Sequence, residues 1–460
     1  MGEPRSYIEK IRKDIEDSRT SRLWEDSVNM LSTVSESIFS RSAHFILELL
    51  QNAEDACSRV RRASGEIKFS VSPDEIRVTH NGALFTEQDV SDICGVRSSK
   101  KPEQETLGYL GIGFKSVFKV SDRPQVYSGG FHFKFDKSAY EDAAKEPWQI
   151  IPIWIEEYRR PGNDELTTFI LPFRTEEVYQ QTLEALQKLD VHVFLFLKWL
   201  NRLEILDERT GHTKVIKNLG ERDRIATLSK NATKNHFVIF RQTKRVDPTL
   251  GSDPSLAFYK RQNVREREIV LAFGVDDQGN LQRIEDASTL GSVSSFLPLV
   301  EERSGARFLI QSDFLVQPGR EAIQYELAWN HWLVREAAEL AKEAIQEFKG
   351  HNVWRKQFLP LFDFASYTGQ PAFEKLFKPH LHEPLTEFLA SAEIYPTRHG
   401  EAVRPDRVVH ADDELRELLT DEDLPLLFSG GKDLHLADPD VDIKAVPEPV
   451  RHLVNTTTLA

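Results

Sequence analysis

The chain has 460 residues, of which 40% are hydrophobic, and a formal charge of −14 from 59 Lys+Arg and 73 Asp+Glu. This size and apolar content predict roughly two to four packed domains, and the negative charge argues against a general nucleic-acid-binding surface. The two cysteines, Cys57 and Cys94, are too few for a disulfide framework and indicate a reducing compartment. No apolar run approaches about 18 residues and the N-terminus is charged, so we expect no signal peptide, no membrane span and a cytoplasmic protein, with the nucleus left open.

The first part of the chain alternates between helical and extended patterns. Residues 1–30 form a charged helical arm, and residues 43–62 form an amphipathic helix whose apolar positions recur at helical spacing. A polar stretch over 97–106 lacks periodicity, and the glycine-rich segment after it opens a helix expected over 114–120. Alternation of apolar and polar residues predicts strands at 67–71 and 75–79 and within 124–135 and 148–173.

Two later changes of pattern divide the chain further. A helix over 178–188 is followed by several strand patterns, and a long helix over 329–348 closes that region. We expect an α/β fold of the α+β sandwich type. The predicted parts are a helical arm (1–30), a first α/β domain (31–175), a middle α/β domain (176–348) and a C-terminal extension (349–460).

The helix over 43–62 carries a polar stripe beside its apolar face. Glu48, Asn52 and Asp55 follow one another at positions i, i+4 and i+7, so they share one face. Hydrolysis of a phosphoanhydride needs an aligned water and a metal ion. Glu48 could orient and deprotonate that water, and the amide oxygen of Asn52 is a hard ligand suited to Mg²⁺. The alternative is a solvated polar face, and nearby His44 is expected to be a surface or core histidine.

The second segment of interest is rich in glycine. Gly108, Gly111 and Gly113 would let backbone N–H groups approach phosphate oxygens, at the start of the helix expected near Phe114. Lys115 lies one position too far from Gly108 for a Walker P-loop, and the glycine spacing is not that of a Rossmann motif. The alternative reading is a turn that simply needs flexibility.

Together, Glu48–Ala56 and Gly108–Asp122 resemble the two main sequence boxes of the GHKL ATPase superfamily. The resemblance implies an α/β sandwich with ATP between the helices and a mixed sheet. It makes Glu48 the general base, Asn52 the Mg²⁺ ligand and Asp55 a supporting carboxylate. It also implies a phosphate-binding segment consisting of Gly108, Tyr109, Leu110, Gly111, Ile112, Gly113 and Phe114, with Lys115 either meeting a phosphate or lying on the surface.

Further stretches resemble the sacsin and plant NOV-like group of heat-shock-chaperone-type ATPases. They are Ser40–Ala56, Phe296–Leu299, Ile310–Val316, Gly319–Glu321 and Trp329–Asn330. This resemblance implies that the middle domain lends Arg320, with Gln324 four residues later, to the γ-phosphate. The alternative is a loop arginine paired with Glu321 or Glu326.

The adenine-reading box departs from the family pattern. Where the family has Asp-x-Gly-x-Gly, this chain has His80-Asn-Gly-Ala-Leu84. Asn81 can offer a carbonyl acceptor, neutral His80 can accept at one ring nitrogen, and Gly82 is kept. Thr167 aligns with the family's threonine near adenine, with Thr168 as the alternative.

These observations predict a chaperone-like module that binds MgATP, closes a lid over about 95–113 and hydrolyses ATP slowly. Its conformational change would be read by a protein partner, a client or a second copy in an ATP-dependent homodimer. Three alternatives remain: a nucleotide-sensing scaffold that does not hydrolyse ATP, a histidine-kinase-like phosphotransfer enzyme, and a DNA-processing ATPase, against which the net charge argues.

Overall fold

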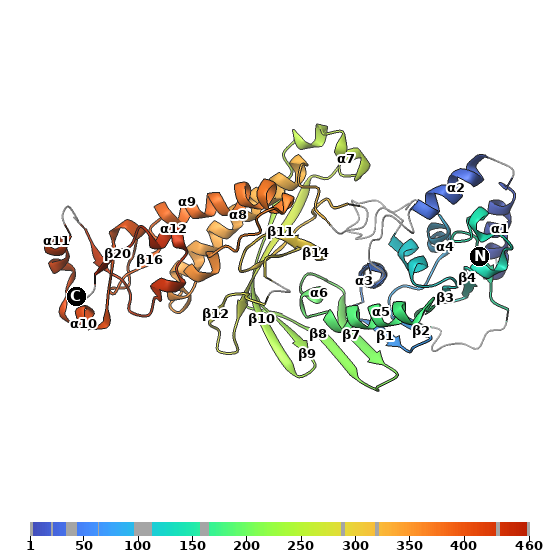
Figure 1. Ribbon diagram of the computed structural model, residues 1–460, viewed down its shortest axis with the longest axis horizontal. Helices are drawn as coiled ribbons and strands as arrows, with labels where there is room; N and C mark the ends of the chain where they lie inside the picture. Colours follow the sequence, from blue (N-terminus) through green and yellow to red (C-terminus); the bar gives the residue numbers. More distant parts are fainter. Residues whose placement is uncertain are drawn as a thin grey trace. The chain divides into compact units, whose positions relative to one another are not determined.

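The computed structural model describes residues 3–19, 22–33, 44–62, 64–95, 113–156, 165–286, 290–317, 322–428 and 433–457. They form two compact units (Figure 1). The N-terminal unit comprises Met1–Gly220, Leu228–Lys234 and Pro254–Val264, and the C-terminal unit comprises Glu221–Thr227, Asn235–Asp253 and Arg265–Ala460. Both units mix helices and strands, which confirms the expected α/β class. The four-part division made from the sequence stays a prediction.

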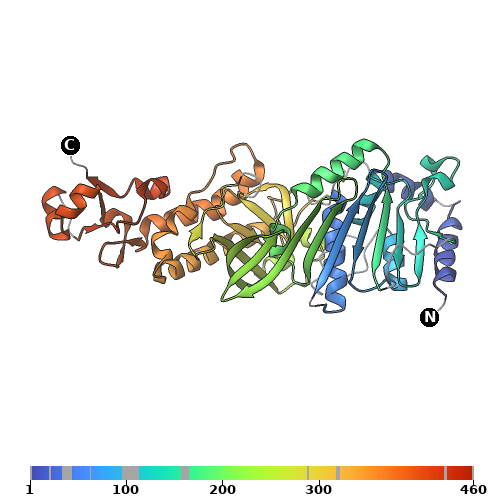
Figure 2. The same ribbon diagram turned by 90° about the horizontal axis from the view of Figure 1, so that it is seen from below.

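The N-terminal unit is built on a mixed sheet with the strand order β8-β7-β1-β2-β6-β3-β4-β5. β1 pairs with β7 in parallel, whereas the pairs β1–β2, β2–β6, β3–β6, β3–β4, β4–β5 and β7–β8 are antiparallel. Figure 2 shows these strands side by side, in blue, cyan and green. Their bounds are β1 (Gly65–Val71), β2 (Glu75–His80), β3 (Gln125–Ser128), β4 (Phe131–Lys134), β5 (Ile153–Trp154), β6 (Thr167–Pro172), β7 (Leu200–Asp207) and β8 (Thr213–Arg222).

One face of this sheet is apolar and buried. Phe69 pairs with Val78 and Val78 with Phe169, so the three side chains share a face. The same register pairs His80 with Thr167 two residues further along, on the same face. All five side chains are buried. Two of the predicted site residues therefore lie at one end of the apolar face.

The helices of this unit agree in large part with the expected ones. Thr86 and Asp89 form a capping box at the start of α4. The helix expected over 114–120 is instead a 3₁₀-helix, η3, in which the Ser116 hydroxyl donates to the carbonyl of Gly113 and so competes with the backbone for that acceptor. The helical segments are α1 (Pro4–Glu16), α2 (Arg22–Thr33), α3 (His44–Arg59), α4 (Glu87–Cys94), η3 (Gly113–Lys119), η4 (Lys137–Ala139), η5 (Ala143–Lys145), α5 (Glu176–Lys188), α6 (His192–Leu195) and α7 (Ser255–Phe258).

The C-terminal unit has its own strands, in the order β14-β13-β15-β11-β10, with β12 paired to β11. Its core includes a cluster of phenylalanines, in which the Phe273 ring lies 4.7 Å from that of Phe308 and 5.1 Å from that of Phe348. The strands are β10 (Thr233–Arg245), β11 (Glu266–Val275), β12 (Leu281–Gln282), β13 (Ser292–Ser295), β14 (Leu297–Arg303) and β15 (Leu309–Gln311). The strands β8, β9 (Ile225–Lys230) and β10 contain residues of both units.

A long helix, α8 (Ala328–Gly350), packs on β11 and on a π-helix, η9 (Phe373–His382). The remaining helical segments are η6 (Leu250–Ser252), η7 (Trp354–Lys356), η8 (Leu359–Phe362), α9 (Glu383–Ser391), η10 (Pro405–Arg407), α10 (Asp413–Leu418), η11 (Asp421–Asp423), α11 (Leu424–Leu427), η12 (Ile443–Ala445) and α12 (Glu448–Arg451). The short strands are β16 (Tyr395–Pro396), β17 (Ala402–Val403), β18 (Val408–Ala411), β19 (His435–Leu436) and β20 (Asn455–Thr457). Within the described ranges, no helix is both long enough and apolar enough to span a membrane.

Candidate functional site

The polar stripe of α3 is largely buried. Glu48 is 7% exposed and Asp55 4%, while Asn52 is partly exposed. The Nε2 atom of His44, one turn before Glu48, lies 3.6 Å from the Glu48 Oε1 atom, and His44 itself is buried. Glu48 is therefore not part of a solvated face. The structure places a histidine beside the candidate base, a neighbour that only the i, i+4 spacing of the two residues could indicate.

Gly113 lies directly against the Glu48 carboxylate. A Cβ atom added at Gly113 would lie 1.8 Å from Glu48 Oε2, so the carboxylate would have to move. The end of the glycine segment and the middle of α3 therefore meet, although 65 residues separate them in the sequence. The residue at this point has to be glycine for Glu48 to keep its position.

The loop after β2 packs against the second half of α3. The Ala83 N–H donates to the Ala56 carbonyl at 2.9 Å. A Cβ on Gly82 would lie 2.7 Å from the Ala56 Cβ and 2.8 Å from the Cys57 nitrogen, so only glycine permits this approach. Gly113 and the loop after β2 thus both pack against α3.

His80 is buried and neutral. Burial lowers the pKa of His80 to about 4, and its Nδ1 atom accepts a hydrogen bond from the Gly82 N–H at 3.2 Å. A neutral ring that accepts at Nδ1 carries its hydrogen at Nε2. The expected neutral state is therefore present, but the accepting nitrogen is used within the loop.

Asn81 has a structural role in the same loop. Its Oδ1 atom accepts from the Glu66 N–H at 2.8 Å, and its Nδ2 atom donates to the Ser64 carbonyl at 3.0 Å. Both polar groups of the carboxamide thus hold the loop to the start of β1. The structure shows these partners in place of the open acceptor expected from the sequence.

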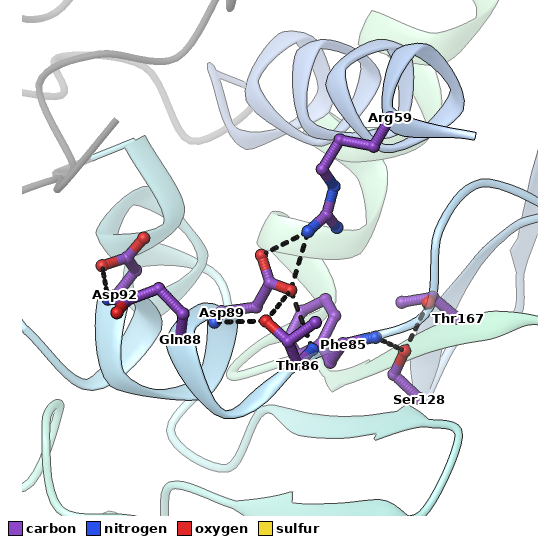
Figure 3. A network of polar contacts seen from close by, with 8 residues as sticks. All are labelled: Arg59, Phe85, Thr86, Gln88, Asp89, Asp92, Ser128 and Thr167. Atoms are coloured by element: carbon purple, nitrogen blue, oxygen red, sulfur yellow. Dashed lines mark hydrogen bonds and ion pairs between the residues drawn. The ribbon is translucent and has the colours of Figure 1, made fainter. Parts of the chain in front are cut away.

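Thr167 belongs to a short chain of hydroxyl groups. Its Oγ1 atom lies 2.6 Å from the Ser128 Oγ atom, which also accepts from the Phe85 N–H at 2.9 Å (Figure 3). Thr167 is fully buried and pairs with His80 across β2 and β6. Thr168, the alternative candidate, lies beside the Thr79 hydroxyl at 3.4 Å on the opposite face of the sheet.

Phe114 and Lys115 both point into the core. The Phe114 ring is 5.8 Å from that of Phe169. Lys115 is 1% exposed, and its Nζ atom donates to the carbonyls of Ile93 at 2.6 Å and Gln149 at 3.1 Å. Burial lowers the pKa of Lys115 to about 8. The alternative of a surface lysine is wrong, and the ammonium group is committed to two backbone carbonyls.

Two further contacts, which the sequence did not indicate, hold α3 in place. Glu54 accepts backbone N–H bonds from Lys198, Trp199 and Leu200, at 2.7 to 3.2 Å, and so joins α3 to the start of β7. At the C-terminal end, the Arg59 Nη1 atom lies 2.9 and 2.8 Å from the two carboxylate oxygens of Asp89 on α4 (Figure 3).

Several predicted residues lie outside the described ranges: Gly108, Tyr109, Leu110, Gly111, Ile112 and Arg320, together with most of the expected lid. Gln324 is described and belongs to the C-terminal unit, where its N–H donates to the Leu315 carbonyl at 3.0 Å. Among the residues with described positions, no group of three or more His, Cys, Asp or Glu side chains could hold a metal ion. Asn52 fits Mg²⁺ only as one oxygen ligand, with the others supplied by phosphates and water, which is how this ion is commonly held.

Comparison with known proteins gives two kinds of similarity, and no protein-family model matches the chain. Over 335 residues the chain is 29% identical to Protein NO VEIN of Arabidopsis thaliana. This match covers 69% of this chain but 12% of NO VEIN. The chaperone protein HtpG of Psychrobacter cryohalolentis is 30% identical over 124 residues, and that of the Wolbachia of Brugia malayi is 30% identical over 128 residues. These two matches cover 21% and 22% of this chain and 19% and 20% of the relatives. The expected relationship to heat-shock-type chaperones is therefore confirmed at a coarse level: the chain is similar to NO VEIN over most of its length and to HtpG over about a fifth of it.

Proposed function

We propose that the N-terminal unit is a GHKL-type domain that binds MgATP and hydrolyses it slowly. The observation that carries this proposal is the contact between Gly113 and the buried Glu48 carboxylate. It brings the end of a glycine-rich segment, suited to holding phosphates, against a side chain suited to activating water. Neither feature alone would favour hydrolysis over an ordinary helix and turn.

In this proposal Glu48 orients the attacking water and accepts its proton. His44, whose Nε2 atom lies 3.6 Å from Oε1, is placed to help hold the orientation of the carboxylate. Asn52 would be the protein ligand of Mg²⁺, which would neutralise charge on the phosphates. Asp55, one turn further along, would support the site from the same helix.

Base recognition would differ from that of the family. The family's aspartate accepts from the adenine amino group, whereas His80 uses Nδ1 within its loop and has a hydrogen at Nε2. Thr167 and Ser128 remain as hydroxyl groups close to His80 on the same face of the sheet. We therefore expect a weaker preference for adenine over guanine nucleotides than an aspartate would give.

We further propose that the C-terminal unit senses the γ-phosphate through Arg320 and Gln324. A cation supplied by a separate unit would make the arrangement of the units depend on the phosphate, as an arginine finger does. The relationship to chaperones supports a protein client or a second copy of the chain as the reader of that change, and a cytoplasmic setting.

The test combines calorimetry of ATP binding in the presence of Mg²⁺ with phosphate release. We expect Glu48→Ala to bind ATP with near wild-type affinity and to lose turnover by about 100-fold or more, the usual size of a general-base contribution. Arg320→Ala should bind ATP and hydrolyse it more slowly. Glu66→Gln, at an exposed position of β1, is the matched control and should behave as wild type. Equal phosphate release from wild type and Glu48→Ala would contradict the proposal.

A second candidate function is a nucleotide-sensing scaffold without hydrolysis. The departure of His80–Leu84 from the family's adenine-reading box motivates it. Tight ATP binding by wild type with no phosphate release above the Glu48→Ala level would select this function.

A further inference from the structure

In the C-terminal unit, several hydrogen bonds join the two segments at the base of one loop. We call the two short segments 315–317 and 322–324 the neck of this loop. Val316 and Ile323 form an antiparallel bridge, the Gln317 N–H donates to the Ala322 carbonyl at 2.9 Å, and the Gln324 N–H donates to the Leu315 carbonyl at 3.0 Å. The two sides of the neck are thus joined along their whole length.

One side chain from α8 binds both sides of the neck. Asn330 is fully buried, and its Oδ1 atom accepts from the Leu315 N–H at 2.9 Å. Its Nδ2 atom donates to the Leu315 carbonyl at 2.8 Å and to the Gln324 carbonyl at 2.9 Å. Both N–H groups and the oxygen of this carboxamide are therefore used to set the distance between Leu315 and Gln324.

Other polar groups hold the same region. Glu302, on β14 and 6% exposed, accepts from the Ile323 N–H at 2.8 Å through Oε1. A ring nitrogen of His331 lies 2.7 Å from the Tyr325 carbonyl. Burying a carboxylate and a carboxamide is costly unless their hydrogen bonds are made. An ordinary surface turn needs only its own backbone hydrogen bonds. The extra buried side-chain bonds therefore indicate that the exact geometry of the neck is needed for function.

Gln324 has a fixed backbone and a partly exposed side chain. Its N–H and its carbonyl are both bound within the neck, so its backbone cannot shift independently. Its side chain is partly exposed, and its carboxamide has no hydrogen-bond partner among the residues that the structure describes. A fixed backbone with an uncommitted carboxamide is the arrangement expected of a side chain that is held ready for a ligand.

We propose that Asn330 is a positioning residue of the proposed ATPase, which acts by fixing the backbone of Gln324, with Glu302 as a second support of the neck. This inference rests on the proposed function and adds to it the residues that set the geometry of the phosphate-sensing side. Asn330 does not touch the nucleotide.

The experiment uses Asn330→Asp in the full chain. An aspartate keeps the acceptor for the Leu315 N–H but loses the two donors to the Leu315 and Gln324 carbonyls. We expect kcat for ATP to fall about tenfold while KM stays within about twofold of wild type, because the ATP-binding residues belong to the other unit. Hydrogen exchange at the Gln324 amide should become faster in the same variant.

The matched control is Asn280→Asp, in the turn between β11 and β12 of the same unit. The Asn280 carboxamide donates to Asp276 at 3.0 Å and accepts from Gln357 at 3.0 Å, so this change also removes a donor from a bonded carboxamide. It should leave kcat unchanged. If Asn330→Asp does not fold, Glu302→Ala, which removes the acceptor for the Ile323 N–H, takes its place and should also lower kcat at constant KM.

A double variant tests whether Asn330 acts through Gln324. If it does, Gln324→Ala and the combined Asn330→Asp, Gln324→Ala variant should have the same kcat. Additive losses, or a folded Asn330→Asp with the kcat of the Asn280→Asp control, would overturn the inference and leave the proposed function standing. A wild type that releases no phosphate would instead overturn the proposed hydrolysis, and this inference with it.

Discussion

At the scale of single residues, the buried carboxylate of Glu54 links a helix to a strand. It is 5% exposed and accepts the N–H groups of three successive residues, Lys198, Trp199 and Leu200. Burial raises the pKa of Glu54, and these backbone hydrogen bonds act in the opposite direction. The helix that carries Glu48 is thereby attached to the strand β7.

Glu54→Gln tests this attachment. The amide nitrogen cannot accept, so at least one backbone N–H would lose its partner in a buried place, at a cost of about 2 kcal/mol. We expect the urea midpoint of unfolding to fall by a corresponding amount, with the slope unchanged. Glu184→Gln, which removes an exposed ion pair with Lys188, should change the midpoint little. A Glu54→Gln protein as stable as this control would contradict the assignment.

Some of these roles could be predicted from the sequence and others could not. Glu54 follows Leu50 by four residues and precedes Cys57 by three, so its place on the apolar face of α3 was a signal that it has a buried partner. For Lys115 there was no such signal. A lysine two positions after a glycine at a helix start is usually exposed, and only the carbonyls of Ile93 and Gln149, distant in sequence, explain its burial.

At the scale of elements, the contact between η3 and α3 predicts the effect of adding one methyl group at Gly113. In Gly113→Ala the added Cβ would meet Glu48 Oε2 at 1.8 Å, so the carboxylate must move. Since a misplacement of about 1 Å can cost about 100-fold in rate, we expect turnover to fall toward that of Glu48→Ala. Phosphate release and ATP affinity would be measured together.

The control for this glycine change is Gly350→Ala at the end of α8, where a Cβ would have nothing within 4 Å. It should keep wild-type turnover. Retention of full activity by Gly113→Ala would show that the Glu48 position is not used in the reaction.

Elements with strong periodicity were predicted well, and the element next to the glycines was not. The period of α3 and the alternation of β1 and β2 depend on residues that face a local apolar surface. The segment after Gly113 becomes a 3₁₀-helix because Ser116 binds the Gly113 carbonyl and because Phe114 packs on Phe169 of β6. That ring contact is a tertiary one, which the sequence alone could not indicate.

At the scale of the whole molecule, each unit contains a buried histidine whose pKa is strongly lowered. Burial lowers the pKa of His80 in the N-terminal unit and of His382 in the C-terminal unit to about 4. The His382 ring is stacked on Phe364 at 4.2 Å and donates to the Ser304 carbonyl. A second ring proton on His80 would be at Nδ1, the atom that accepts from the Gly82 N–H.

This gives a pH dependence with a definite sign. Between about pH 4 and pH 6.5 the unfolded chain takes up protons at these histidines and the folded chain does not. The stability they confer is therefore complete above about pH 6.5 and is lost as the pH falls toward 4, by at most about 3 kcal/mol for each ring. Urea unfolding at pH 7.5, 5.5 and 4.5 should show it. His382→Gln should flatten the profile, while His452→Gln, at an exposed side chain, should not.

The way the backbone is shared between the units has a consequence for dissection and for gene rearrangement. A fragment that ends at Gly220 would lack Leu228–Lys234 and Pro254–Val264, which belong to the same compact unit. A fragment that begins there would carry those segments away from their packing partners. No single cut therefore separates two complete halves, so the two units are expected to be inherited, shuffled and expressed together.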